Sequence, residues 1–248
     1  MNAALSLLGV VTLVLCWQLA WSTGAVNTVL LPAPAEVGRA LLHNLLTGSF
    51  WAATAMTLAR SVVGFALATF LGIPLGLVVG YFPRVYQTLG TLIDFFRSLP
   101  ATAMFPVFML FFGIGDMSKI AVVVFACGLI VTVNTAYGVK NANPTRSLVA
   151  KILRASSCFV FFKVILPNAI PEVTAGLRIS LSLSLVLVVV SEMFAGTSAG
   201  LGQMIYDMHL AFRIPQMYSA VAVTGVLGYG MNRLFLVWER RYVHWAGK

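Results

Sequence analysis

Long apolar runs dominate the pattern of this 248-residue chain. A helix that crosses a bilayer needs about 20 apolar residues, and only helices or closed barrels satisfy every backbone group in lipid. The runs are continuous, whereas barrel strands alternate apolar and polar residues over about ten positions. The pattern therefore predicts an all-helical integral membrane protein with about six spans, at 5–21, 57–81, 88–113, 119–138, 171–195 and 217–238.

The segment between the first two runs is different in character. Leu31-Pro32-Ala33-Pro34 interrupts the chain, and the mildly amphipathic stretch 35–46 that follows predicts a helix lying at the membrane interface. We expect residues 1–56 to form a peripheral first helix and interfacial segment, and residues 57–248 to form the core with a loop at 139–170. The first run could instead be a cleaved signal peptide, but residues 2–4 supply no basic n-region.

Composition supports the membrane assignment. Apolar residues make up 60% of the chain and charged residues 9%, against roughly 45–50% and about 25% in soluble domains. The formal charge of +9 is spread among the apolar runs and forms no dense basic stripe, so nucleic acid is not an expected partner. With the N-terminus inside, the inner connections carry nine Lys and Arg residues, and the outer ones carry three, Arg39, Lys119 and Arg213. This asymmetry predicts that both termini and the 139–170 loop are cytoplasmic.

Two features of the second and third spans suggest close packing or a solute path. Gly72, Gly76 and Gly80 lie on one helical face, which is typical of tight helix packing and less often of a flexible pore-lining helix. In the third span, Asp94 and Arg97 are spaced so that they could pair, and Pro100 and Pro106 interrupt the helix. A proline break frees carbonyls that could line a cavity.

The fifth span carries three serines at every second position, 180, 182 and 184, which spread around the helix and favour packing. Glu192 lies at its outer end, where it would either reach water or help to form an outer gate. The candidate residues of a translocation pathway or gate are Pro100, Pro106, Ser182 and Glu192.

Motifs for chemistry on this chain are sparse. Gly196-Thr197-Ser198-Ala199-Gly200 matches the serine-hydrolase pattern, and His209 keeps an intramembrane serine hydrolase open as an alternative. The chain has no phosphate-binding loop, dinucleotide motif or zinc-protease motif, and its three cysteines have no metal-ligand spacing. We therefore expect no catalytic residue, metal or cofactor, and any energy for transport must come from an ion gradient or another subunit.

The long inner loop is the most informative segment. Asn143-Pro144 fits a helix start, and 145–154 places Leu148, Val149, Ile152 and Leu153 on one side, away from basic residues. Such a basic amphipathic helix would lie on anionic lipid or dock into a groove of a partner.

This loop resembles the coupling-loop signature of binding-protein-dependent ABC transporter permeases. The resemblance is carried by Ala150–Ser156, by Phe162–Pro171 and by Gly176-Leu177-Arg178. Further matches to the nitrate/sulfonate/taurine branch are Leu31–Val37, Gly72–Gly76, Phe112–Asp116 with Ser118-Lys119, and Gly200-Leu201-Gly202.

The resemblance implies a type I ABC importer permease in the bacterial inner membrane, with no enzymatic activity of its own. It implies partners: cytoplasmic ATPase subunits that hold ATP and Mg, a second permease copy (a homodimer by default, a heterodimer as the alternative), and an extracytoplasmic solute-binding protein. The solute would be a small anion of the sulfonate/taurine, nitrate or bicarbonate type, with a pyrimidine-type vitamin precursor or an ion-coupled carrier as alternatives. The residues that the resemblance assigns to ATPase coupling are Pro144, Arg146, Leu148, Val149, Ala150, Lys151, Ile152, Leu153, Arg154, Ala155, Ser156, Leu166 and Pro167.

The chain departs from the family pattern inside this loop. The pattern has Glu, Ala and Gly where Leu148, Val149 and Arg154 stand, so Ala150 alone survives of the opening triad. The departures predict an altered ATPase contact, or a heterodimer whose other subunit keeps the standard loop.

Overall fold

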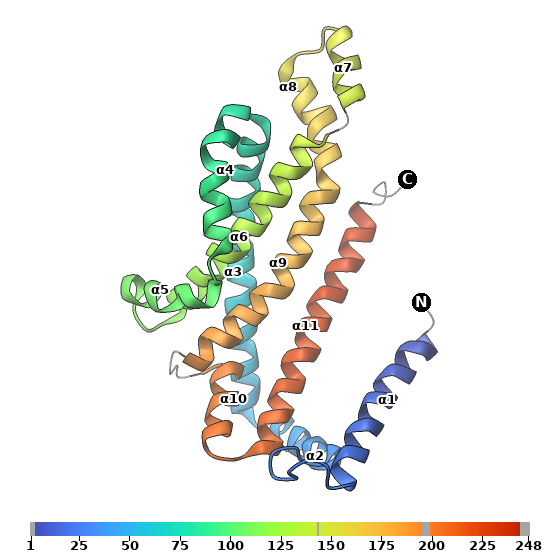
Figure 1. Cartoon of the computed structure of the whole chain (residues 1–248), viewed down its shortest axis with the longest axis vertical. Coiled ribbons are helices and arrows are strands. Elements are labelled where there is room, and N and C mark those ends of the chain that lie inside the picture. Colours follow the sequence, from blue (N-terminus) through green and yellow to red (C-terminus); the bar gives the residue numbers. More distant parts are fainter. Residues whose placement is uncertain (1–2, 143, 195–198, 244–248) are drawn as a thin grey trace.

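The computed structural model describes residues 3–142, 144–194 and 199–243, except for the side chains of residues 3–7, 144, 146, 147 and 151. Within these ranges every regular element is a helix, as predicted. Figure 1 shows long helices running side by side, with α7 projecting at one end and α2 and α10 lying at the other. These ends are called the α7 end and the α10 end.

The helices follow one another along the chain without any strand in the described part. In chain order they are α1 Ala3–Ser22, α2 Pro34–Leu45, α3 Gly48–Tyr81, α4 Pro83–Ser98, the 3-10 turn Ala101–Met104, α5 Phe105–Phe112, α6 Asp116–Lys140, α7 Pro144–Ile152, α8 Ser157–Val160, the π-turn Phe161–Ile165, α9 Leu166–Phe194, α10 Leu201–Leu210 and α11 Ile214–Tyr242.

Four stretches are long and apolar enough to cross a membrane: α3, α6, Ser157–Phe194 and α11. They confirm four of the six predicted spans, although α3 begins nine residues before the predicted 57–81. In α1, the part described with its side chains, Leu8–Ser22, is a shorter apolar helix. A crossing by α1, and the division into 1–56 and 57–248, stay predictions.

The third predicted span, 88–113, is present as two helices with a break between them, and the interruption that the prolines predicted is confirmed at Pro100. The axes of α4 and of the segment Ala101–Phe112 differ by 91°. The bend follows from Pro100, which has no backbone N–H and disfavours the helical conformation of the preceding residue. Leu99 accordingly has φ −73° and ψ 133°, an extended conformation. Pro106 lies in the first turn of α5, where a proline is tolerated.

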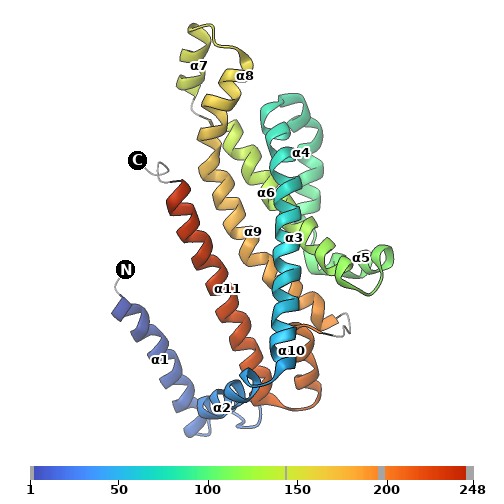
Figure 2. The same cartoon turned by 180° about the vertical axis from the view of Figure 1, so that it is seen from behind.

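The most extensive helix contact joins α3 and α6, which lie side by side in Figure 2. Added Cβ atoms at Gly72 and Gly76 would lie 2.9 Å from the Gly128 carbonyl oxygen and 2.6 Å from the Thr132 carbonyl oxygen, respectively. Both distances are too short for a side chain, because the neighbours are backbone atoms of α6. The small-residue stripe of α3 therefore serves close helix packing, as the sequence predicted.

The third core helix, α9, packs on both α3 and α6. The hydroxyls of Ser61 on α3 and Ser184 on α9 lie 2.7 Å apart, and the Ser180 hydroxyl donates to the Cys127 carbonyl of α6 at 3.3 Å. Ser180 and Ser184 are fully buried, which confirms that they serve packing, whereas Ser182 is exposed. Apolar residues fill the rest of this junction: Ala68, Val122, Val123, Cys127, Leu187 and Val188.

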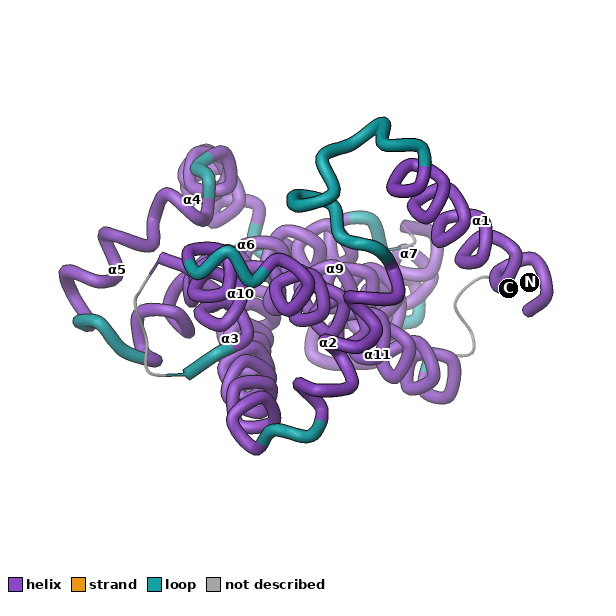
Figure 3. Tube along the Cα trace, turned by 90° about the horizontal axis from the view of Figure 1, so that it is seen from below, coloured by secondary structure: helices purple, strands orange, loops and turns teal. Residues whose placement is uncertain are grey.

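The remaining helices surround this core. Seen along the bundle in Figure 3, α3, α6 and α9 lie centrally, α4 and α5 lie on one side, and α1 lies on the other. The helix predicted at 35–46 is present as α2, while its position at the membrane interface stays a prediction. Its Asn44 side chain donates to the Ser219 hydroxyl of α11 at 2.8 Å. The Trp17 indole N–H of α1 donates to the Pro32 carbonyl at 3.0 Å. These contacts fasten the N-terminal segment at the α10 end.

Candidate functional site

At the α7 end, the predicted amphipathic helix is present as α7, Pro144–Ile152. Proline at the first helical position suits a helix start, because its missing N–H has no intrahelical acceptor there. The helix projects beyond the other elements in Figure 1, and its main contact is with the π-turn Phe161–Ile165. The apolar side chains of α7, and that of Leu153 directly after it, are uncovered: Leu148, Val149, Ile152 and Leu153 are 58%, 49%, 73% and 75% exposed.

The end of α7 explains two positions of the family pattern. Arg154 has φ +55°, a left-handed conformation that costs an L-residue roughly 1–2 kcal/mol and that glycine adopts freely. The pattern's glycine at this position therefore suits the backbone better than arginine does. Ala150, the surviving member of the triad, is buried, and its carbonyl accepts from the Ala155 N–H at 3.0 Å.

The other predicted coupling residues follow α7. The Ser156 hydroxyl accepts a hydrogen bond from the Phe159 N–H and caps α8. Leu166 and Pro167 open α9 directly after the π-turn. The side chains of Pro144, Arg146 and Lys151 lie outside the described residues.

Toward the α10 end, a cluster of charged side chains joins three core helices. The Arg60 guanidinium of α3 lies 2.7 Å from an Asp116 carboxylate oxygen of α6 and 2.5 Å from a Glu192 carboxylate oxygen of α9. It also donates to the Ala199 carbonyl at 2.8 Å. The side chain of Arg60 is 4% exposed, that of Glu192 is 0% exposed, and that of Asp116 is 52% exposed. These three residues form what we call the Arg60 cluster.

The Arg60 cluster also contacts the start of α10. The Thr57 hydroxyl donates to Glu192 at 2.8 Å and accepts from the Leu201 N–H at 2.8 Å. The Gly202 N–H donates to the same Glu192 oxygen, Oε2, at 2.9 Å, whereas Arg60 donates to Oε1. Gly200 has φ +154°, and a Cβ there would lie 2.4 Å from the Glu192 carboxyl carbon, so the turn folds directly over this carboxylate. Every oxygen of the buried Glu192 carboxylate thus has a donor.

Three expectations about charged residues need correction. Glu192 does not reach water, because α10 and the Gly200 turn cover it. Lys119 is not in an outer connection: α6 begins at Asp116, so Lys119 lies in the first turn, fully buried, and its ammonium donates to the Gly115 carbonyl at 2.8 Å. The Asp94–Arg97 ion pair is absent, since both ion pairs among the described residues involve Arg60.

The four residues predicted for a translocation pathway lie in different places. Pro100 and Pro106 flank the bend between α4 and α5, and both are exposed. Ser182 lines a 460 Å³ cavity between α9 and α11. Glu192 lies in the Arg60 cluster, and its part in an outer gate stays a prediction.

The serine of the hydrolase pattern, Ser198, lies outside the described residues. His209 is exposed on α10. Within the described ranges, no group of three or more His, Cys, Asp and Glu side chains is placed to hold a metal ion.

The Arg60 cluster was not predicted as a unit, and neither was α10. Arg60, Asp116 and Glu192 are far apart in the chain, so no local spacing connects them. One signal existed: an arginine inside an apolar run is costly in a bilayer, about 2.5–3.5 kcal/mol on insertion scales, and therefore requires acidic partners from other spans. The few carboxylates near span ends, Asp116 and Glu192 among them, were the available partners.

Comparison with known proteins shows which protein family this sequence matches. The family model described as binding-protein-dependent transport system inner membrane component matches residues 72–244. A probable ABC transporter permease protein of Brucella melitensis is 32% identical over 229 residues, which cover 92% of each chain. The taurine transport system permease protein TauC of Escherichia coli is 29% identical, covering 100% of this chain and 91% of its own. The bicarbonate transport system permease protein CmpB of Synechococcus elongatus is 29% identical, covering 96% and 88%.

Solved structures agree on the fold. An inward-facing structure of the MetNI methionine ABC transporter aligns with a TM-score of 0.67 over 76% of this chain and 94% of that one, at 18% identity. At this identity the likeness concerns the fold, which is that of a type I importer permease, as the sequence predicted.

Proposed function

The chain belongs to the family of binding-protein-dependent transport system inner membrane components. We propose that it works as one subunit of an ATP-driven importer. The chain itself is the membrane-spanning permease subunit. The proposed partners are two cytoplasmic ABC ATPase subunits, which hold ATP and Mg, a second copy of this chain, and an extracytoplasmic solute-binding protein. Family membership does not favour the ion-coupled carrier, the vitamin-precursor permease or the serine hydrolase.

The proposed contact with the ATPase rests on the exposed apolar face of α7. Leu148 and Ile152 of this helix, and Leu153 directly after it, are each more than half exposed, and the helix projects beyond the bundle. A helix that lays its apolar face into a groove of a partner moves with that partner as a rigid body. We therefore assign the ATPase-docking site to α7 and propose that the α7 end faces the cytoplasm.

The Arg60 cluster supports a role for the opposite end in closing the pathway. It ties α3, α6, α9 and the start of α10 together through hydrogen bonds of 2.5–3.0 Å. A buried hydrogen-bond network of this kind is either fully formed or broken, because a partly formed network would leave buried charges without partners. In the proposed alternating access, movement of α7 would be transmitted along α9 to this cluster, which would hold the outer side closed.

The proposed solute is small and carries an acidic group. TauC and CmpB, which each match nearly the whole chain, are named for taurine and bicarbonate. These relatives support the sulfonate/taurine, nitrate or bicarbonate class that the sequence predicted.

The ATPase contact is testable by placing charge on α7. The double variant Leu148→Asp with Ile152→Asp should insert normally but lose its ATPase, because two carboxylates would be buried without partners at the interface. Loss of a central interface residue typically costs 2 kcal/mol or more, so recovery of ATPase with the affinity-purified permease should fall at least about tenfold.

Two controls accompany this test. Leu148→Met with Ile152→Leu keeps the apolar character and should retain the ATPase. Leu46→Asp places the same charge on an 88% exposed leucine at the α10 end and should also retain it. Normal ATPase recovery and solute uptake by the Asp double variant would refute the assignment.

A further inference from the structure

A groove of 460 Å³ runs between α9 and α11, which lie side by side in Figures 1 and 2. Its lining is mostly apolar, and it is open to the surroundings, since Val186 of α9 and Tyr229 of α11 are each more than half exposed. Both helices are long and apolar enough to cross a membrane, so the bilayer surrounds this part of the molecule. From Ser182 to Val190 the groove extends about 12 Å along α9, close to the roughly 15 Å of hydrocarbon in one leaflet.

Two exposed arginines lie at the end of the groove that is nearer to α7. Arg178 precedes Ser182 by one turn of α9, and its Nε–H donates to the side-chain oxygen of Asn232 at 3.2 Å. Asn232 lines the groove, and Arg233 follows it on α11. Both ion pairs in the described part of the chain involve Arg60, so neither of the two arginines has a carboxylate partner there. A guanidinium has several N–H donors, and the hydrogen bond to Asn232 uses one of those of Arg178, so donors remain for a ligand.

The depth of these arginines fits the phosphate layer of a membrane. Residues 214–232 of α11 carry no charge and are bounded by Arg213 and Arg233. At about 1.5 Å per residue this stretch is roughly 28 Å long, close to the hydrocarbon thickness of a bilayer, about 30 Å. Arg233, and Arg178 beside Asn232, would therefore lie where the lipid headgroups begin, in the leaflet at the α7 end.

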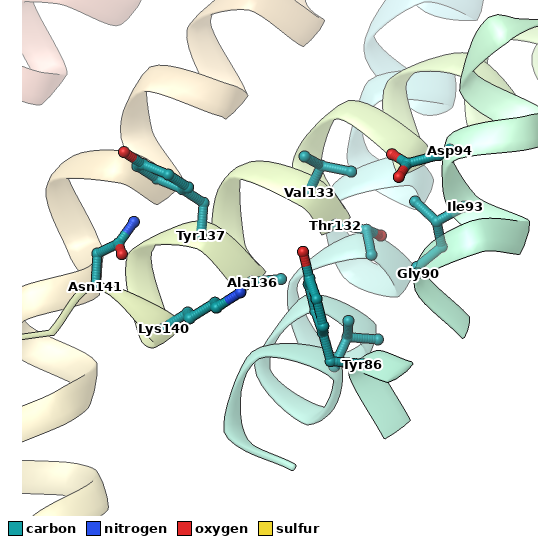
Figure 4. Close-up of a pocket in the computed structure, with 11 residues that line it drawn as sticks. Tyr86, Gly90, Ile93, Asp94, Thr132, Val133, Ala136, Tyr137, Lys140 and Asn141 are labelled. Carbon is teal, nitrogen blue, oxygen red and sulfur yellow. The ribbon is translucent and has the colours of Figure 1, made fainter. Parts of the chain in front are cut away.

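The cavity of 250 Å³ between α4 and α6 offers a contrast in charge (Figure 4). Its cation is Lys140, whose ammonium lies 4.1 Å from the centroid of the Tyr86 ring, and Asp94 lines the same cavity. A phosphate there would meet a side chain of each sign. The residues that line the groove between α9 and α11 include no carboxylate, so the arginines at its end attract an anion without opposition.

The half of α11 that is nearer to α7 packs loosely within one chain. The residues of α11 that are buried, Ile214, Ser219 and Ala220, all lie near its start at the α10 end. Gly225 and Gly228 leave the groove wide further along, where larger side chains would close it against α9. A chain-like apolar ligand in the groove would fill this space and fasten α11 to α9.

We propose that the groove binds an anionic phospholipid, with one acyl chain between α9 and α11 and the phosphate on Arg178 and Arg233. Guanidinium groups match phosphate oxygens in geometry as well as in charge, and basic pockets between membrane helices are suited to lipid headgroups. The assignment goes beyond the importer function and does not depend on it. Under the orientation proposed above, the lipid belongs to the cytoplasmic leaflet.

Lipid retention tests this assignment directly. The permease, purified with its partner subunits in mild detergent, is stripped of native lipid and incubated with equal amounts of phosphatidylglycerol and phosphatidylcholine that carry the same palmitoyl and oleoyl chains. Native mass spectrometry counts the lipids that stay bound. Phosphatidylglycerol should be retained over phosphatidylcholine by about tenfold, the factor expected for one charge-assisted contact.

Removal of the two arginine charges should abolish this preference. Arg178→Gln with Arg233→Gln keeps polar side chains but removes the attraction to a net negative headgroup, so the two lipids should be retained equally. Arg213→Gln is the matched control, because it removes an exposed cation from the opposite end of α11. It should leave the preference unchanged.

Filling the groove should release the lipid without any change of charge. Gly225 lines the groove, and an added Cβ there meets no atom within 4 Å, so Gly225→Leu can place its side chain where the acyl chain would lie. Retention of both lipids should fall by about tenfold, the factor for two or so methylenes that lose their burial. Gly230→Leu, at an equally open position of α11 that does not line the groove, should retain both. Excess inorganic phosphate should leave phosphatidylglycerol bound, because phosphate has no chain to bury.

Equal retention of the two lipids by the wild type, a preference that survives the double glutamine variant, or normal retention by Gly225→Leu would each overturn the proposal. Displacement by inorganic phosphate would show a site for the free ion and not for a lipid. The same spectra report the number of permease copies. Loss of a second copy in Gly225→Leu with unchanged lipid retention would show that the groove is a contact between two chains, and the lipid assignment would be wrong.

Discussion

The two ends of this bundle are constructed in opposite ways. At the α7 end, a short helix presents apolar side chains that are half to three-quarters exposed and packs on little else. At the α10 end, the polar side chains of Thr57, Arg60 and Glu192 are buried and satisfy one another. The first end therefore requires a partner to cover it, whereas the polar groups of the second are satisfied within one chain.

The largest loss should come from breaking the Arg60 cluster. Arg60→Met leaves the Glu192 carboxylate buried without its cation, which typically costs about 3–5 kcal/mol. Thermal unfolding of the purified permease in detergent should show a correspondingly large drop in midpoint. Adding Glu192→Gln should recover at least half of the loss, because the amide keeps an acceptor for the Gly202 N–H without an unpaired charge. An Arg60→Met midpoint equal to wild type would show that the cluster contributes nothing to the closed end.

A smaller loss should follow from crowding the turn that covers Glu192. In Gly202→Ala the new Cβ would lie 2.1 Å from the Val189 carbonyl oxygen, a backbone atom that cannot move aside alone. Overpacking of this kind costs roughly 1–3 kcal/mol, measured by the same unfolding midpoint. Gly230→Ala on α11 is the matched control, because its Cβ meets nothing within 4 Å, and it should be neutral or stabilising. Equal effects of the two variants would contradict the close approach.

Asp116→Asn should cost about 1 kcal/mol or less. Its side chain is 52% exposed, so water screens its attraction to Arg60, and half-exposed ion pairs contribute little. The unfolding midpoint should fall only slightly relative to Arg60→Met. A loss as large as that of Arg60→Met would mean that Asp116, and not Glu192, is the main partner of the guanidinium.

The smallest effect should be a local gain at the other end. Arg154→Gly relieves a left-handed conformation at φ +55°, so the end of α7 should open less often. Hydrogen exchange of the amides of 150–156 should slow, while the global unfolding midpoint stays within about 0.5 kcal/mol of wild type. Ala155→Gly, at a position without positive φ, should not slow exchange. Faster exchange in Arg154→Gly would contradict the strain argument.

These features differ in how far the sequence predicts them. The helix α7 and the small-residue stripe of α3 are predictable, since both depend on residues three or four positions apart in one helix. The proline at position 100 predicts an interruption, but not the 91° bend, which depends on how α5 packs on α6. The Arg60 cluster depends on residues from three helices that only the folded chain brings together. Its polar members therefore appear isolated along the sequence.

The surroundings of Asp94 were mispredicted for a related reason. Asp94 and Arg97 are three residues apart, and local spacing therefore predicted an ion pair that the structure does not contain. Asp94 instead lines a cavity whose other charge, Lys140, comes from α6. Helical spacing identifies neighbours on one helix, but packing between helices decides which of them share a cavity.

Hydrogen exchange of the whole complex tests the contrast between the two ends most directly. The amides of α7 and α10 would be followed in the permease purified with its ATPase and again after the ATPase is removed. We expect protection of α7 by the ATPase, by at least about tenfold, with no change at α10. Unchanged exchange of α7 in a complex that hydrolyses ATP would contradict the assignment of this helix as the docking site.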